Sequence, residues 1–385
     1  MEPMIQAIKN DSHDPEIVSY CLDSLNYIIS GPLADSPAAT WPESEQTMTN
    51  NSAKATPVGS TSTTSRGQHQ SSVYHDPGRE LAEIFLKKVE NLTIIVESAR
   101  DSNFKIRWVI VRILCGLVRQ KLDIVQDYIL SDPMKLTHLT QLISEEHELI
   151  RNDALVLFVH LTQSNQTIQN ILAYDCFDKI MYIIELEGYL EGTVAVVNDC
   201  LNILLNLIQY NQSNQLLFRE SGHIQKLMPF FNSIQNIQWT FERTACIVLV
   251  LQIIDSMLTT ISTPSTNSNV NSNSNDNVTT TSNSEENIRR CQEIMQRCGL
   301  LDKLCELLTA SSMPIGVLSE TMNTASDIVR GHLGPNASMV MQTSSMMPIL
   351  LLSMVKEMCQ EQERRTTDLY NYMQVLHEFV SKRLH

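Results

Sequence analysis

One stretch of this chain repeats its pattern of polar and apolar positions after 46 residues. Asn152-Asp153-Ala154-Leu155 begins the first copy, and Asn198-Asp199-Cys200-Leu201 begins the second (198 − 152 = 46). A fainter copy begins at Ile106-Arg107, 44 residues before Ile150-Arg151. A helical period in the mid-forties is typical of armadillo and HEAT arrays, whose units stack to bury apolar faces that no unit can bury alone. The pattern therefore predicts a docking protein rather than a catalyst.

Three segments are apolar over most of a helical surface: 107–118, 153–161 and 199–208. A helix with little polar surface is buried on several sides, so we expect these to be the inner helices of successive units. Further helices are expected at 16–29, 81–98, 244–258 and 318–329. We predict an all-α, armadillo/HEAT-like, right-handed superhelical solenoid.

Two segments rich in Ser, Thr and Asn interrupt this pattern, at 31–78 and 261–287. Neither can bury enough apolar surface to offset chain entropy, so we expect two disordered loops. Asn165 and Asn211 stand where helices stop and restart, and we expect their side chains to cap free backbone N–H groups. The predicted division is 1–30 (N-terminal partial repeat), 31–78 (disordered insertion), 79–260 (armadillo-like repeats), 261–287 (disordered loop), 288–356 (armadillo-like repeats) and 357–385 (divergent C-terminal helix).

Composition and charge argue against several classes of protein. The 28 Lys and Arg residues are outnumbered by 43 Asp and Glu, which gives a formal net charge of −15 and argues against nucleic-acid binding. The nine cysteines form no CxxC pairs, so neither a zinc site nor a disulfide framework is expected. The N-terminus lacks the basic and apolar regions of a secretion signal, and no apolar run approaches the roughly 18 residues of a membrane span. We expect a cytoplasmic protein without a cofactor.

Five residues are candidate partner contacts. Arg107 and Arg151 occupy matched positions and could form a cationic ladder, although pairing with nearby acidic side chains is the alternative. Trp108 could be a binding anchor or part of the core. Asn202 and Asn206 follow Asn198 at a spacing of four, as in a ladder that grips a peptide backbone. Nuclear-import receptors pair such an Asn with a Trp on successive repeats, so confinement to one helix argues against that role.

Two other clusters carry weaker signals. Cys291, Cys298 and Cys305 are spaced by seven, but Gly299 should break the helix between them and core packing is the simpler interpretation. His138, His147 and His160 lie near acidic residues without a nucleophile, and we expect these histidines to point apart. No GxGxxG, P-loop, HExxH or GxSxG motif occurs. We therefore expect no enzymatic activity.

Several short motifs occur together along the chain: Ile150-Arg151-Asn152-Asp153, Leu161-Thr162-Gln163-Ser164-Asn165, Asp199-Cys200-Leu201, Ser213-Asn214-Gln215, Phe218-Arg219-Glu220, Cys298-Gly299-Leu300-Leu301 and Glu320-Thr321-Met322-Asn323. They resemble the globular head of the general vesicular transport factor family, which tethers vesicles to Golgi membranes. They appear in the family's order over most of 1–30 and 80–356. The resemblance implies an armadillo-like head that acts in ER-to-Golgi and intra-Golgi transport before membrane fusion. It also implies peripheral Golgi association and partners among Rab-family GTPases, SNAREs and tethering complexes.

The chain departs from the family pattern at both ends. Its first helix resembles the interior of the family's head, so we expect at least one unit to be missing. The match stops after Lys356, and the tail at 357–385 is too short for the coiled coil through which full-length members form homodimers. This pattern predicts a partial or alternatively spliced chain. The alternatives are an armadillo adaptor or regulatory scaffold, such as a GTPase-regulator adaptor, or a hydrolase that uses the three histidines.

Overall fold

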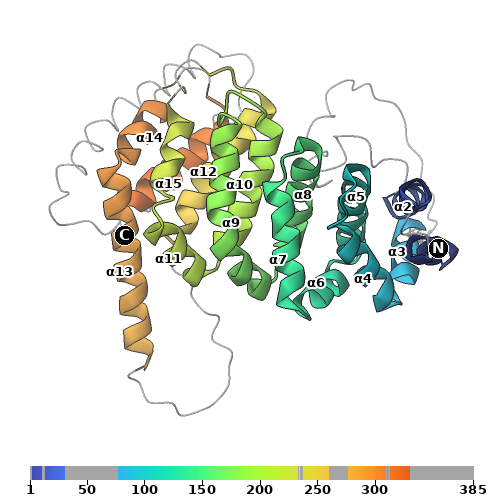
Figure 1. The fold of residues 1–385 in the computed structure, drawn as a ribbon. Helices are drawn as coiled ribbons and strands as arrows, with labels where there is room; N and C mark the ends of the chain where they lie inside the picture. Colours follow the sequence, from blue (N-terminus) through green and yellow to red (C-terminus); the bar gives the residue numbers. More distant parts are fainter. Residues whose placement is uncertain are drawn as a thin grey trace, which may run out of the picture. The chain divides into compact units, whose positions relative to one another are not determined.

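The computed structural model describes residues 2–10, 14–30, 77–232, 234, 237–259, 276–308, 310 and 313–329. Every regular element within these ranges is a helix (Figure 1). The chain divides into two compact units, Met1–Tyr128 and Ile129–His385. Most of the predicted loops at 31–78 and 261–287, and the predicted helix at 357–385, lie outside the described residues.

The first unit is built around a long inner helix. Its elements are α1 (Glu2–Asn10), α2 (Pro15–Ser30), α3 (Pro77–Leu86), α4 (Val89–Ser98), α5 (Phe104–Gln120) and most of α6 (Leu122–Leu130). Helix α5 packs against α2, α3 and α4. A Cβ atom at Gly116 of α5 would lie 2.7 Å from Ser30 Oγ and 3.0 Å from Ile29 Cγ2 of α2. Glycine at this position therefore permits the close approach of α2 and α5.

The segment predicted as one helix at 81–98 is two helices, so that prediction was wrong in its length. The exposed Lys88 between α3 and α4 has φ −111° and ψ 110°, an extended conformation that ends the first helix. The buried Asn91 side chain donates a hydrogen bond to the carbonyl of Phe85 at 2.9 Å across this break. Apolar periodicity continues through the break, because Phe85 and Leu92 are both buried, and therefore does not reveal it.

Within the described residues of the second unit, four inner helices pack in sequence. Helix α10 (Val194–Ile208) contacts α8 (Glu148–Leu161) and α12 (Phe241–Ser256), and α12 in turn contacts α15 (Ile315–Val329). The other elements are α7 (Pro133–Gln141), η3 (Leu142–Ser144), α9 (Gln166–Leu186), α11 (Gln212–Glu220), η4 (Gln225–Phe231), α13 (Asp276–Arg297) and α14 (Leu300–Leu308). The predicted all-α, armadillo-like architecture is confirmed.

Helix α13 begins earlier than the sequence pattern predicts. It starts at Asp276, so residues 276–287 are helical rather than part of a loop. No Gly or Pro interrupts this stretch, and Glu286 pairs with Arg290 one turn later at 3.1 Å. Polar composition indicated a loop, but a polar sequence can form a helix when part of it packs on a neighbour. None of the described helices has the length and apolar character needed to cross a bilayer.

Candidate docking surface

The inner helices of the second unit reproduce the 46-residue repeat in their burial. The buried positions of α8 recur 46 residues later as buried positions of α10. The matched pairs are Ile150 with Val196, Arg151 with Val197, Ala154 with Cys200, Leu155 with Leu201, Leu157 with Ile203, Phe158 with Leu204, and Leu161 with Leu207. The inner helices predicted at 153–161 and 199–208 are therefore buried as expected, and these two repeats have the same core positions.

The turns between helices also recur from one 46-residue repeat to the next. The side chains of Asn165 and Asn211 accept hydrogen bonds from the backbone N–H groups of Ile168 and Asn214, which confirms both predicted caps. In the same repeat, Gln169 and Gln215 each donate to a carbonyl seven residues back, at 2.9 and 3.2 Å. These amides satisfy carbonyls at helix ends that would otherwise lack partners.

Arg151, predicted as a partner contact, is buried inside the second unit. Its guanidinium forms an ion pair of 2.5 Å with Glu187, the residue that follows α9, and its Nε donates to Asn152 at 3.3 Å. The two charged side chains are only 8% and 13% exposed. Acidic pairing, the alternative to the cationic ladder, is therefore the observed arrangement for Arg151. Its role in partner binding stays an untested prediction, but its burial favours a structural role.

Arg107 and Trp108 lie in the first unit, on α5, and are half-buried. Arg107 Nη1 donates to the carbonyls of Asp101 and Ser102 at 2.9 and 3.0 Å, which ties α5 to the preceding turn. The guanidinium of Arg112 lies 5.2 Å from the centre of the Trp108 ring, a distance typical of a cation–π contact. Both predicted residues thus have intramolecular roles, and contact with a partner stays a prediction.

The asparagine ladder of α10 is largely used within the fold. Asn206 Nδ2 donates to the Val159 carbonyl at 3.0 Å and to Thr162 Oγ1 at 3.1 Å, which joins α10 to the end of α8. Asn198 Nδ2 approaches Cys246 Sγ of α12 at 3.9 Å. Asn202 donates to the carbonyl and side-chain oxygen of Asn198, both at 2.9 Å. Both side chains are half-buried, and we still propose Asn202 and Asn206 as partner contacts.

The three histidines that the sequence analysis expected to point apart are spread over α7 and the two ends of α8. His147 precedes α8 and His160 lies in its last turn, about 20 Å away along the helix axis at 1.5 Å per residue. His138 lies on α7. Gly299, with φ 78°, separates Cys298 from α14, which confirms the predicted helix break. Burial raises the pKa of the Cys291, Cys298 and Cys305 thiols, so these side chains stay protonated at neutral pH.

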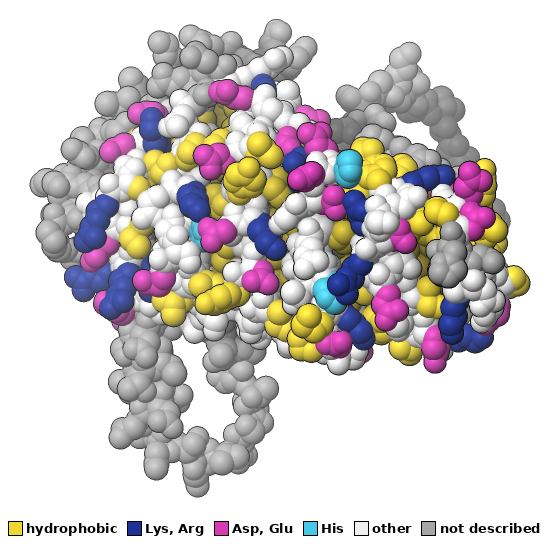
Figure 2. Space-filling model, in the orientation of Figure 1, with side chains coloured by type: hydrophobic (Ala, Val, Ile, Leu, Met, Phe, Trp, Pro, Cys, Tyr) yellow, Lys and Arg dark blue, Asp and Glu magenta, His cyan; other side chains and the backbone are white. Residues whose placement is uncertain are grey.

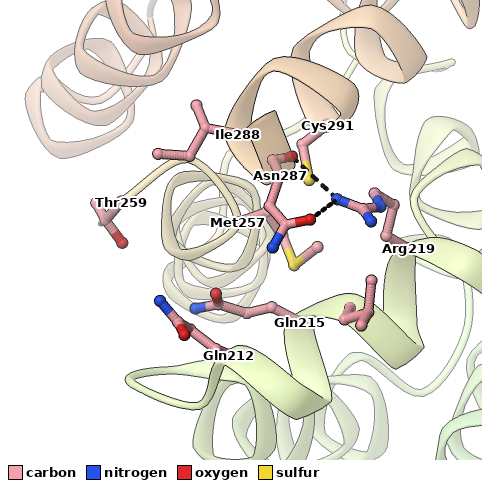
Figure 3. Close-up of a pocket in the computed structure, with 9 residues that line it drawn as sticks. Gln212, Gln215, Arg219, Met257, Thr259, Asn287, Ile288 and Cys291 are labelled. Atoms are coloured by element: carbon pink, nitrogen blue, oxygen red, sulfur yellow. Dashed lines mark hydrogen bonds between the residues drawn. The ribbon is translucent and has the colours of Figure 1, made fainter. Parts of the chain in front are cut away.

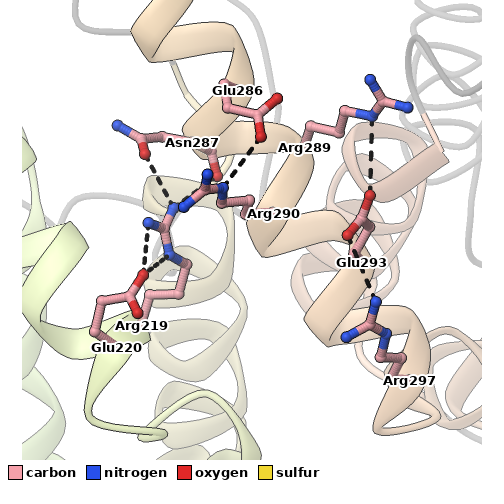
Figure 4. Close-up of polar contacts among 8 residues, drawn as sticks. All are labelled: Arg219, Glu220, Glu286, Asn287, Arg289, Arg290, Glu293 and Arg297. Atoms are coloured by element: carbon pink, nitrogen blue, oxygen red, sulfur yellow. Dashed lines mark hydrogen bonds and ion pairs between the residues drawn. The ribbon is translucent and has the colours of Figure 1, made fainter.

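A small pocket lies at the junction of α11, α13 and the end of α12 (Figure 3). Its lining residues are Gln212, Gln215, Leu216, Arg219, Met257, Thr259, Asn287, Ile288 and Cys291. Arg219 points across it and donates to the carbonyl and the side-chain oxygen of Asn287 at 3.0 and 3.2 Å. Arg219 also pairs with Glu220 of the same helix at 2.8 Å (Figure 4), so its charge is compensated within α11 while its bonds to Asn287 join α11 to α13.

The exposed face of the inner helices has features that the sequence interpretation missed. Leu149 of α8 and Phe241 of α12 are 57% and 62% exposed, and Ala195 of α10 is also exposed. These three residues are themselves spaced by 46, so the repeat contains them, but the period alone does not show that they are exposed. We define the inner-helix face as this row together with Asp153, Asp199, Asn202 and Glu242, which are half-buried or exposed on the same helices.

The carboxyl of Asp199, on this face, has a strongly raised pKa. Burial raises the pKa of its carboxyl from 3.8 to about 7, and burial is the only cause of the shift. No described cation therefore compensates the ionised form. Burial raises the pKa of the Cys246 thiol to about 12, and the charges of Asp199 and Glu242 add to this shift, so both carboxyls lie near this side chain of α12. Figure 2 shows a face of the molecule on which acidic, basic and apolar side chains are interspersed.

Inner helices that recur along the chain and pack on one another define a helical-repeat protein of the armadillo type. A Uso1 crystal structure superposes with a TM-score of 0.64 at 21% identity, covering 86% of this chain and 46% of that one. A designed armadillo repeat protein superposes with a TM-score of 0.52 at 11% identity, covering 85% and 98% of the two chains. Both comparisons concern the fold.

Sequence comparison identifies the family. General vesicular transport factor p115 of Homo sapiens is 32% identical over 333 residues, which are 86% of this chain and 29% of p115. Intracellular protein transport protein Uso1 of Saccharomyces cerevisiae is 30% identical over 148 residues, 38% of this chain and 8% of Uso1. No family model matches the chain. The chain belongs to the general vesicular transport factor family, and it spans less than a third of the length of p115.

Proposed function

We propose that this chain is the protein-docking head of a vesicle tether that acts in ER-to-Golgi and intra-Golgi transport. The proposal is supported by the match to p115 over 333 residues, which covers most of the chain. The fold, which superposes on that of Uso1, agrees with it. The head would bind Rab-family GTPases, SNAREs and tethering-complex proteins, and would reach Golgi and vesicle membranes through them. Homodimerisation belongs to the full-length family members.

The mechanism in this proposal is geometric. Rigidly packed inner helices hold exposed side chains at fixed positions, and binding requires no chemical step. The separation of His147 from His160 argues against a hydrolase, because a general acid–base site needs convergent side chains. The partner-binding role of Arg107, Trp108, Arg151, Asn202 and Asn206 is part of the proposal and is testable residue by residue.

The test is a chimera in which this chain replaces the matched 333 residues of human p115, expressed in cells depleted of p115. The readouts are the rate at which a secretory cargo reaches the Golgi and the position of the fluorescent chimera. We expect cargo transport to recover and the chimera to concentrate at the Golgi. The matched control carries Leu161→Asp and Leu207→Asp, which disrupt the core. A stable chimera that restores neither readout would refute the proposal.

A further inference from the structure

We propose that the inner-helix face of the second unit binds an extended partner segment in which an Arg or Lys side chain, flanked by apolar residues, meets Asp199. This inference rests on the proposed docking function and specifies the chemistry of one partner. Three features support it: exposed apolar residues on the two flanking helices, an uncompensated carboxyl between them, and an excess of acidic groups around it.

The apolar contacts are Leu149 on α8 and Phe241 on α12. Both helices pack on α10, so the two side chains flank Ala195 of the central helix. The other large apolar side chains of α8, α10 and α12 are buried or half-buried. Exposed aromatic and aliphatic anchors on either side of a small residue provide a surface that a partner's apolar side chains can cover.

The charge on the face is predominantly negative. Asp199 lies one helical turn after Ala195, and exposed Glu148 and Glu242 begin the flanking helices. The nearby cations are already engaged. Arg151 pairs with Glu187, and Arg243 donates to the carbonyls of Leu190 and Gln238 at 3.0 and 3.1 Å. A partner's basic side chain would supply the positive charge that the fold itself does not provide for Asp199.

The spacing of the helices sets the spacing of the partner's side chains. Packed helices lie about 8–10 Å apart, and an extended chain advances about 3.3 Å per residue. A segment that crosses α8, α10 and α12 therefore places every third residue over a successive helix. The matching pattern is apolar-x-x-basic-x-x-apolar, with the basic residue over α10.

The probe is a fluorescein-labelled heptapeptide, Leu-Ser-Ser-Arg-Ser-Ser-Phe, compared with its Gln-centred counterpart by fluorescence anisotropy at pH 8. We expect the wild-type chain to prefer the Arg peptide by about tenfold, the usual value of one charge-assisted hydrogen bond. Asp199→Asn, which keeps the side-chain shape, should abolish this preference. Leu149→Ser and Phe241→Ser should weaken the binding of both peptides by the same factor. The matched control is Tyr174→Ser, at an exposed tyrosine of α9 outside this face, which should change neither affinity.

Three outcomes would overturn the inference: no binding of the Arg peptide to the folded chain, equal affinity for the Arg and Gln peptides, or an unchanged preference in Asp199→Asn. Self-association that Phe241→Ser removes would also overturn it, because the face would then bind a second copy. The p115 chimera tests the transport function separately. A chimera carrying Asp199→Asn that still restores Golgi cargo delivery would leave the docking head intact while showing that this contact is dispensable.

Discussion

The buried ion pair between Arg151 and Glu187 gives the sharpest test of how the second unit is held together. It joins α8 to the residue that follows α9, at 2.5 Å, with side chains that are 8% and 13% exposed. Removal of one partner from a buried pair leaves an uncompensated charge, which typically costs about 3–5 kcal/mol. We expect Arg151→Met to destabilise the fold by this amount, because Met fills similar space without neutralising Glu187.

The double variant Arg151→Met/Glu187→Leu separates the cost of an orphaned charge from the value of the pair. With both charges absent, most of the lost stability should return, since apolar replacements of buried pairs are often neutral or stabilising. Arg290→Met is the control. Its pair with Glu286 is 58% and 53% exposed and joins residues one turn apart. An exposed pair of this kind contributes only about 0.3–0.5 kcal/mol.

The assay is urea unfolding followed by circular dichroism, with the free energy of unfolding obtained by linear extrapolation. The two units can unfold in separate transitions, in which case the shift should affect the transition that contains α8 to α10. A change below about 1 kcal/mol for Arg151→Met would refute the reasoning, because it would mean that water solvates Glu187 in the folded chain.

Two further predictions concern the core and the inner-helix face. Leu207→Ala should destabilise the fold by about 2–5 kcal/mol, because Leu207 is fully buried. Leu149→Ala, at an exposed position, should change stability little. Comparable urea midpoints for the two variants would contradict this prediction. Asp199→Asn should be stabilising in a pH-dependent way. The folded pKa of about 7 lies above the unfolded value, so Asp199 costs nothing below about pH 4 and destabilises increasingly as pH rises towards 7. The advantage of Asn, measured from urea midpoints at pH 4 to 8, should grow over that window and then level off; a constant difference would contradict the elevated pKa.

The sequence was informative wherever a feature depends on neighbours along the chain. The 46-residue period located α8 and α10, because a repeated apolar pattern specifies the same buried face in each copy. Asn165 and Asn211 were recognised as caps because a cap bonds to residues three positions away. The same period also contained Leu149, Ala195 and Phe241, but a periodic pattern does not distinguish an apolar residue in the core from one left in solvent.

Tertiary structure decided the features that depend on distant residues. Arg151 finds its carboxylate 36 residues away, and the same arginine could otherwise have been a surface cation. The raised pKa of Asp199 comes from atoms of other helices that exclude water, which no local motif encodes. Local periodicity determined that these helices form and which sides they bury. Packing between helices determined which charges are paired, which are desolvated, and which side chains remain available to a partner.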